Sequence, residues 1–151
     1  MLLCAFATVA SAATHPDFSG RWKMLKDQSD FGKFTRPDIV IRVIDHHDPT
    51  LNLHTVETTG GKTSVADISY FTDGSEATNN RSGHSATSKA FWDGAALMIR
   101  TDTTDSTNER VQILERWELS PDGQELVTTS DVITPTGGAH LKLVCQKEAT
   151  K

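Results

Sequence analysis

Short segments rich in β-branched and aromatic residues alternate along the chain with pairs of turn-forming residues. The segments cover residues 18–24, 39–45, 51–58, 63–72, 85–92, 95–103, 109–119, 125–134 and 140–147, and a polar, weakly patterned segment covers 75–81. The turn pairs between them include Gly-Gly or Asp-Gly at 60–61, 73–74, 93–94, 122–123 and 137–138. Such pairs favour tight turns that require a positive φ. Evenly spaced strands joined by tight turns predict an antiparallel meander.

A twisted sheet of this many strands prefers to close, because closure removes its exposed edges. We therefore predict an all-β fold, a single up-and-down antiparallel β-barrel of about eight to ten strands that is either filled by side chains or holds one small ligand. Residues 25–37 are too polar for a core strand, although they include Phe31 and Phe34. This segment is either a lid over a binding mouth or a packed connector.

Residues 1–12 form an uncharged run of apolar and small residues that ends in Ala10-Ser11-Ala12. The run is too short to cross a membrane as a helix, and its small-x-small ending predicts a signal peptide that is cut before Ala13. Because the usual positively charged start is missing, we expect Met1 to lie inside the true leader. The prediction is a secreted or periplasmic protein, with a lipoprotein anchored through Cys4 as the alternative.

The predicted mature chain, residues 13–151, is long enough for one domain with one core. Its net charge is −5. The chain has no basic cluster that would suit a phosphate backbone, so we expect no nucleic-acid partner. Cys145 is the only cysteine after residue 12, and one cysteine forms no internal disulfide. We expect a monomer or a dimer without a transmembrane segment.

Four short motifs occur in order along the mature chain. They are Asp-Phe-x-Gly-x-Trp at 17–22, Ser-Asp-Phe-Gly at 29–32, Trp-Asp-Gly at 92–94 and Arg-Trp-x-Leu-Ser-Pro-Asp-Gly at 116–123. This ordered set resembles the small secreted lipocalin-like proteins of bacteria, which belong to the calycin superfamily of barrels. The resemblance implies small-molecule binding, and it implies a barrel closed by Gly20, Trp22 and a cation from the last strand. Lys142 is our choice for that cation, and Lys147 is the other candidate.

The strand expected at 109–119 is the most informative about an interior. One face carries Val111, Ile113, Glu115, Trp117 and Leu119. A carboxylate within an apolar stripe needs a partner if it is buried, and Arg100 on the preceding strand is the candidate. Glu115 is then a polar anchor or an acid/base inside a cavity, or else it is part of a structural ion pair or turns outward at a bulge.

Hydroxyl groups interrupt the apolar faces of other strands. They belong to Thr55, Ser69, Thr101, Thr128 and Ser130. They suit a cavity that holds water or a polar ligand group, although strand surfaces also favour Thr in general.

These patterns lead to three hypotheses. The first is an exported barrel that binds a small hydrophobic or amphipathic molecule. Its ligand-binding residues would be Trp92, Trp117, Tyr70, Arg100 and Glu115. The second is a calycin-type isomerase, cyclase or hydrolase with Glu115 or a histidine as acid/base, and the third is a filled envelope or interaction protein without a ligand.

We assign no catalytic residue, no cofactor and no metal site. The adjacent His46 and His47 point to opposite faces of a strand, so they do not share an ion easily. The spacing of the histidines follows no known ligand motif for zinc.

Overall fold

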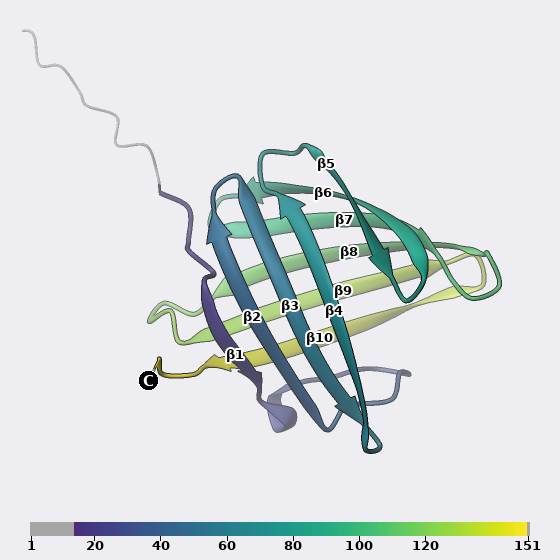
Figure 1. Cartoon of the computed structure of the whole chain (residues 1–151), viewed down its shortest axis with the longest axis horizontal. Coiled ribbons are helices and arrows are strands. Elements are labelled where there is room, and N and C mark those ends of the chain that lie inside the picture. Colours follow the sequence, from purple (N-terminus) through teal and green to yellow (C-terminus); the bar gives the residue numbers. More distant parts are fainter. Residues whose placement is uncertain (1–13, 151) are drawn as a thin grey trace, which may run out of the picture.

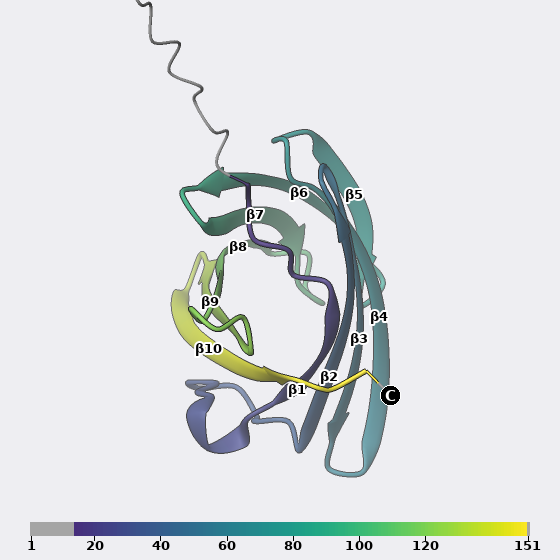
Figure 2. The same cartoon turned by 90° about the vertical axis from the view of Figure 1, so that its left-hand side faces the viewer.

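Ten antiparallel strands form one continuous sheet that curls on itself (Figures 1 and 2). The computed structural model describes residues 14–150, so the predicted leader lies outside the described residues. The strands are β1 (Gly20–Met24), β2 (Ile39–His47), β3 (Thr50–Thr59), β4 (Lys62–Phe71), β5 (Glu76–Arg81), β6 (His84–Asp93), β7 (Ala96–Thr104), β8 (Arg110–Leu119), β9 (Glu125–Thr134) and β10 (Gly137–Lys147). This confirms the predicted all-β barrel and its up-and-down order.

Strand β1 closes the sheet as the pattern predicted, because it lies between β2 and β10. The edges of the sheet are β4 and β5, which are neighbours in the barrel but form no strand ladder. One side chain bridges this seam. The Asn79 amide accepts a hydrogen bond from the Ser69 backbone N–H and donates one to the Ser69 carbonyl, both at 2.9 Å. The amide thus replaces one rung of the missing ladder.

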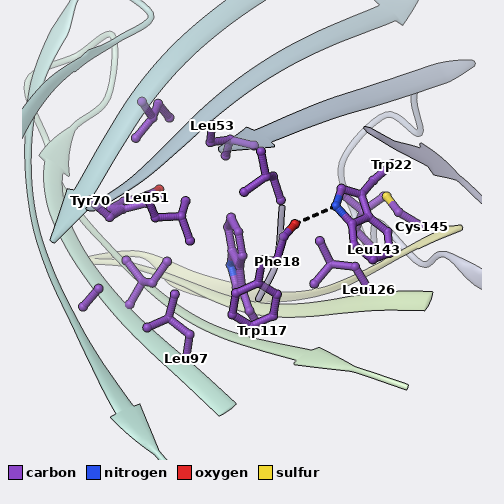
Figure 3. Packing of buried hydrophobic residues seen from close by; sticks show 14 of the residues in the cluster. Phe18, Trp22, Leu51, Leu53, Tyr70, Leu97, Trp117, Leu126, Leu143 and Cys145 are labelled. Carbon is purple, nitrogen blue, oxygen red and sulfur yellow. Dashed lines mark hydrogen bonds between the residues drawn. The ribbon is translucent and has the colours of Figure 1, made fainter. Parts of the chain in front are cut away.

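The barrel has two different ends. The plugged end carries the β2–β3, β6–β7 and β8–β9 turns, and residues 14–19 cross it before β1 begins. The cavity end carries the β3–β4 and β5–β6 turns. Large buried side chains lie between the two ends, and they include Phe18, Trp22, Leu51, Leu97, Trp117 and Leu126 (Figure 3).

The segment between β1 and β2 follows the free edge of β10. It begins with the short 3-10 helix η1 (Lys26–Gln28). The backbone N–H of Leu25 donates to the Val144 carbonyl, and the backbones of Asp30 and Lys142 exchange two hydrogen bonds, all at 2.7 Å. Phe31 packs against the core. These contacts make the segment a packed connector that extends the sheet where β1 is too short to do so.

Candidate functional site

Trp22 lies fully buried below the plugged end of the barrel. Its indole Nε1–H donates to the Phe18 carbonyl at 2.9 Å, which fixes the chain as it enters β1. The Lys147 Nζ lies 5.2 Å from the Trp22 ring centroid, a cation–π distance. Gly20 leaves room for the Lys147 stem, because an added Cβ would lie 2.7 Å from the Lys147 Cε.

The choice of Lys142 as the closing cation is therefore wrong, and Lys147 has this role. Lys142 follows the opposite parity from Leu143, Cys145 and the other inward residues of β10. Its backbone pairs with Asp30 of the connector, away from Trp22.

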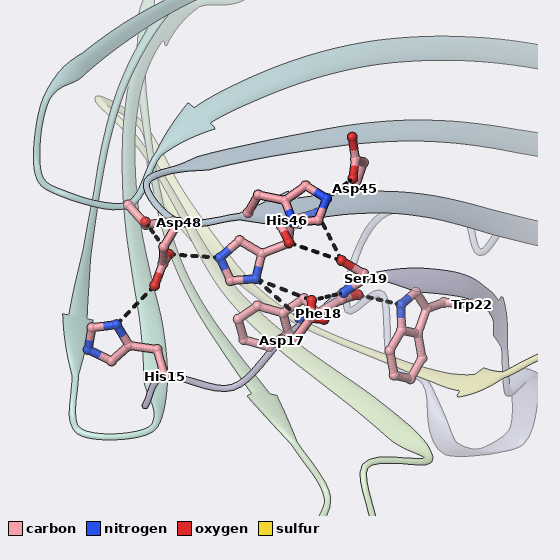
Figure 4. A network of polar contacts seen from close by, with 10 residues as sticks. His15, Asp17, Phe18, Ser19, Trp22, Asp45, His46 and Asp48 are labelled. Carbon is pink, nitrogen blue, oxygen red and sulfur yellow. Dashed lines mark hydrogen bonds and ion pairs between the residues drawn. The ribbon is translucent and has the colours of Figure 1, made fainter. Parts of the chain in front are cut away.

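A buried histidine fixes the N-terminal segment over the plugged end (Figure 4). His46 accepts a hydrogen bond from the Phe18 backbone N–H at Nδ1, so its Nε2–H donates to Asp48, 2.9 Å away. Asp48 also accepts hydrogen bonds from His15 at 3.1 Å and from Thr72 at 2.6 Å. Partial burial opposes ionisation of Asp48, but the hydrogen bonds from Thr72, His46 and His15 outweigh it and lower the pKa of the carboxyl to about 2.

Trp92 lies among the side chains that close the plugged end. Its ring stacks on His15 with centroids 4.3 Å apart and on Phe18 at 5.8 Å. Trp92 is half-buried and packs against the core from the plugged side. This position gives it a structural role at the plugged end, and the cavity lining does not include it.

A cavity of about 310 Å³ lies inside the barrel near the cavity end. Inward-facing residues of β2, β3, β4, β5 and β8 line it, together with one residue of the β5–β6 turn. They are Arg42, Leu53, Thr55, Glu57, Ser64, Ala66, Ile68, Tyr70, Arg81, Ser82 and Glu115. Most of these side chains are polar, and the apolar ones lie toward the packed half of the barrel. The barrel is therefore filled at one end and hollow at the other.

Glu115 is buried in this cavity, Arg42 and Arg81 are half-buried, and each of the three has one buried atom without a partner among the described residues. Arg42 donates to the Thr128 hydroxyl at 3.1 Å, and its guanidinium carbon lies 5.3 Å from the Trp117 ring centroid. The Arg42 Nε, the Arg81 Nη1 and the Glu115 Oε2 are buried without a hydrogen-bond partner among residues 14–150. Buried polar atoms without a hydrogen-bond partner are rare because they are costly. Their presence together at one cavity marks it as the candidate site.

Tyr70 completes this group. The side chain is 1% exposed. Burial raises the pKa of its hydroxyl, and the negative charge of Glu115 raises it further, while Arg81 and Arg42 act in the opposite direction. The Tyr70 hydroxyl therefore stays protonated at ordinary pH.

The sequence predicted part of this set. Tyr70 and Glu115 line the cavity, and Trp117 borders it through Arg42. Arg100 does not, because it pairs in register with Leu114, and its exposed side chain reaches Asp102 on the outer face. The expected Arg100–Glu115 pair is therefore wrong, and the backbone of Glu115 lies opposite Ile99 instead.

The two cavity arginines were missed. Arg42 alternates with buried Val40 and Ile44, so its inward parity was readable from the sequence. Arg81 ends a strand of polar residues and gave no such signal.

Of the hydroxyl groups expected at a cavity, Thr55 lines it. Thr101 and Thr128 are buried outside the lining, where Thr101 bonds to Ser88 and Thr128 accepts from Arg42. Ser69 is exposed on the outer face, so its expected place in the interior is wrong.

The histidines do not assemble an acid/base site with Glu115. His54 lies on the outer face, where its Nδ1 contacts Asp67 at 2.6 Å. His84 contacts the Thr104 hydroxyl near the β7–β8 turn. Within residues 14–150 we find no cluster of three or more His, Cys, Asp or Glu side chains suited to a metal ion. The same residues include no helix long and apolar enough to span a membrane.

No protein-family model matches the sequence, and no curated protein sequence matches it. Solved structures do match. The chain is similar to secretory abundant heat soluble protein 4 from Ramazzottius varieornatus, with a TM-score of 0.63, 16% identity, and coverage of 92% of this chain and 100% of that one.

Two further solved structures resemble the chain. Zebrafish ileal bile acid-binding protein, solved with cholic acid, has a TM-score of 0.63 and 16% identity over 87% of this chain and 98% of that one. Human cRBP IV has a TM-score of 0.57 and 16% identity over 88% of this chain and 99% of that one. At 16% identity these likenesses show that the chain shares the barrel fold of these proteins.

Proposed function

We propose that the protein binds a small amphipathic molecule in the cavity of its barrel. The polar part of this ligand would contact Arg42, Arg81 and Glu115. Its apolar part would lie against Leu53 and Ile68 on the wall toward the packed half. With its predicted leader, the protein would be exported and would bind this molecule outside the cytoplasm.

The observation that carries the proposal is the group of buried, unpaired charged atoms around a hollow space. A barrel with only a structural role would gain stability by filling this space or by pairing the charges. A ligand supplies the missing partners without changing the chain. The volume of about 310 Å³ lies at the small end of ligand pockets, which span about 300–1,000 Å³. A compact ligand is therefore expected.

Two further points support binding over the alternatives. The zebrafish neighbour, a barrel of the same fold, is solved with cholic acid. The enzyme hypothesis pairs Glu115 with His54 or His84, but His54 lies on the outer face of the sheet and His84 contacts Thr104 near the β7–β8 turn.

A fluorescence titration with the anionic probe 1-anilinonaphthalene-8-sulfonate tests the proposal. Thr55→Phe places a ring into the cavity, and Val56→Phe places the same ring on the outer face of the same strand. We expect Thr55→Phe to weaken probe binding at least about tenfold, or about 1.4 kcal/mol, and Val56→Phe to leave it unchanged. Equal binding by both variants would place the probe on the surface and contradict the proposal.

A further inference from the structure

We infer that Glu115 makes the cavity selective for ligands that carry both an acidic group and a hydrogen-bond donor, such as a hydroxylated or amino-bearing acid. This inference rests on the proposed function and names the class of ligand that the same site takes. A plain fatty acid and a plain alcohol would each satisfy only half of the site.

Glu115 requires a donor from the ligand. The residue is 6% exposed, and its Oε2 is buried without a partner among the described residues. Its backbone neighbours across the sheet are Ile99 and Ser130. No cation among residues 14–150 pairs with this oxygen, although two arginines line the same cavity. A hydroxyl or an amine on the ligand would supply the missing hydrogen bond.

The arginines require an acceptor. Thr128 and the Trp117 ring hold the Arg42 guanidinium in place, and the Nε–H has no partner among the residues that the structure describes. The Arg81 Nη1, at the end of β5, is a second buried donor of the same cavity without a partner among the described residues. Guanidinium groups bind carboxylates through paired, charge-assisted hydrogen bonds. An acidic group on the ligand is therefore the partner that suits both side chains.

The charge balance of the lining points to the same class. Arg42 and Arg81 are opposed by Glu57 and Glu115, so the cavity has no net charge that would draw in a simple anion. A plain acid brings its negative charge close to Glu115 and leaves Oε2 unpaired. A site built to bond a ligand hydroxyl rejects the analogue that lacks it, because the buried group then loses its partner.

Isothermal titration calorimetry with three matched probes tests the inference: octanoic acid, 3-hydroxyoctanoic acid and octane-1,3-diol. We expect the wild type to bind the hydroxy acid at least about tenfold tighter than either other probe. Glu115→Met removes the acceptor and should reduce the ratio between hydroxy acid and plain acid to about one. Glu115→Gln keeps one acceptor oxygen and should give an intermediate ratio.

The matched control is Glu118→Gln, the same change of charge on the outer face of the same strand, where Glu118 contacts Arg116. It should keep the wild-type ratio. A ratio near one in the wild type, or a ratio that Glu115→Met leaves unchanged, would overturn the inference while the cavity remained a binding site. No binding of any probe at about 1 mM, or about 4 kcal/mol, would overturn the inference and the proposed function together.

Discussion

Replacing Asp48 with Asn removes the anion that holds the N-terminal segment over the plugged end of the barrel. Asp48 accepts hydrogen bonds from Thr72 and His46 at one oxygen and from His15 at the other. An amide oxygen still accepts the bonds from Thr72 and His46, but the amide NH₂ then faces His15. The change therefore removes the negative charge, and the His15 Nδ1 has to turn from donor to acceptor to keep its contact.

The size of the effect follows from the pKa of Asp48. This pKa falls from an ordinary 3.8 to about 2 in the folded protein, and each pKa unit corresponds to about 1.4 kcal/mol. The ceiling is thus about 2.5 kcal/mol. Because the Asp48 side chain is 42% exposed, solvent screening reduces the expected loss to about 1 kcal/mol.

The pH dependence has a definite sign. The folded-state pKa lies below the unfolded-state pKa, so ionised Asp48 stabilises the fold above about pH 4, and this stabilisation is lost as the pH falls toward about 2. Urea unfolding followed by tryptophan fluorescence measures it. We expect Asp48→Asn to be about 1 kcal/mol less stable than the wild type at about pH 7 and almost equal to it at about pH 2.

The control is Asp45→Asn on the same hairpin, where Asp45 and its partner His47 are both exposed. Its effect should stay below about 0.5 kcal/mol. An Asp48→Asn variant as stable as the wild type near neutral pH, or one whose deficit persists unchanged in acid, would refute the reasoning.

Three further predictions concern the seam, the closing strand and the core. Asn79→Ala removes the amide that bridges β4 and β5, so amide exchange at Ser69 should speed up at least about tenfold; Thr78→Ala, an exposed change on the same strand, should leave it unchanged. Gly20→Ala should lower the unfolding free energy by about 1–3 kcal/mol, because Gly20 has a φ of +143° that other residues rarely adopt; an unchanged urea midpoint would contradict this. Burial raises the pKa of the Cys145 thiol, so in a chain that begins at Ala13 a thiol reagent should modify Cys145 only after unfolding; modification at equal rates with and without urea would disprove it.

Much of the fold was readable from the sequence because local signals repeat along the chain. Asp-Gly and Gly-Gly turns divide it correctly, and the observed β2, Ile39–His47, differs from the expected 39–45 only at its end. The first strand starts later than expected, at Gly20. Phe18 instead packs across the plugged end, because His46 and Trp22 bind its backbone.

Alternation along the strands predicts the correct faces for Arg100 and Lys142. Leu97, Ile99 and Thr101 are buried at alternate positions of β7, which places Arg100 on the outer face. The same alternation of Leu143 and Cys145 leads to Lys147 and away from Lys142.

The cavity could not be predicted in this way. Its volume depends on how side chains from five strands fill a shared interior, and alternation along one strand carries no information about that. Arg81 lines the cavity because the closure of the barrel brings the end of β5 across from β2 and β8.

Native mass spectrometry of the protein purified from its own host tests the central claim most directly. We expect the wild type to show a small-molecule adduct above its denatured mass, and Arg81→Met, which removes a cavity donor, to lose it. The same change at Arg100, on the outer face, should retain the adduct. A bare wild-type mass, or an adduct that survives Arg81→Met as well as Arg100→Met, would contradict binding in the cavity.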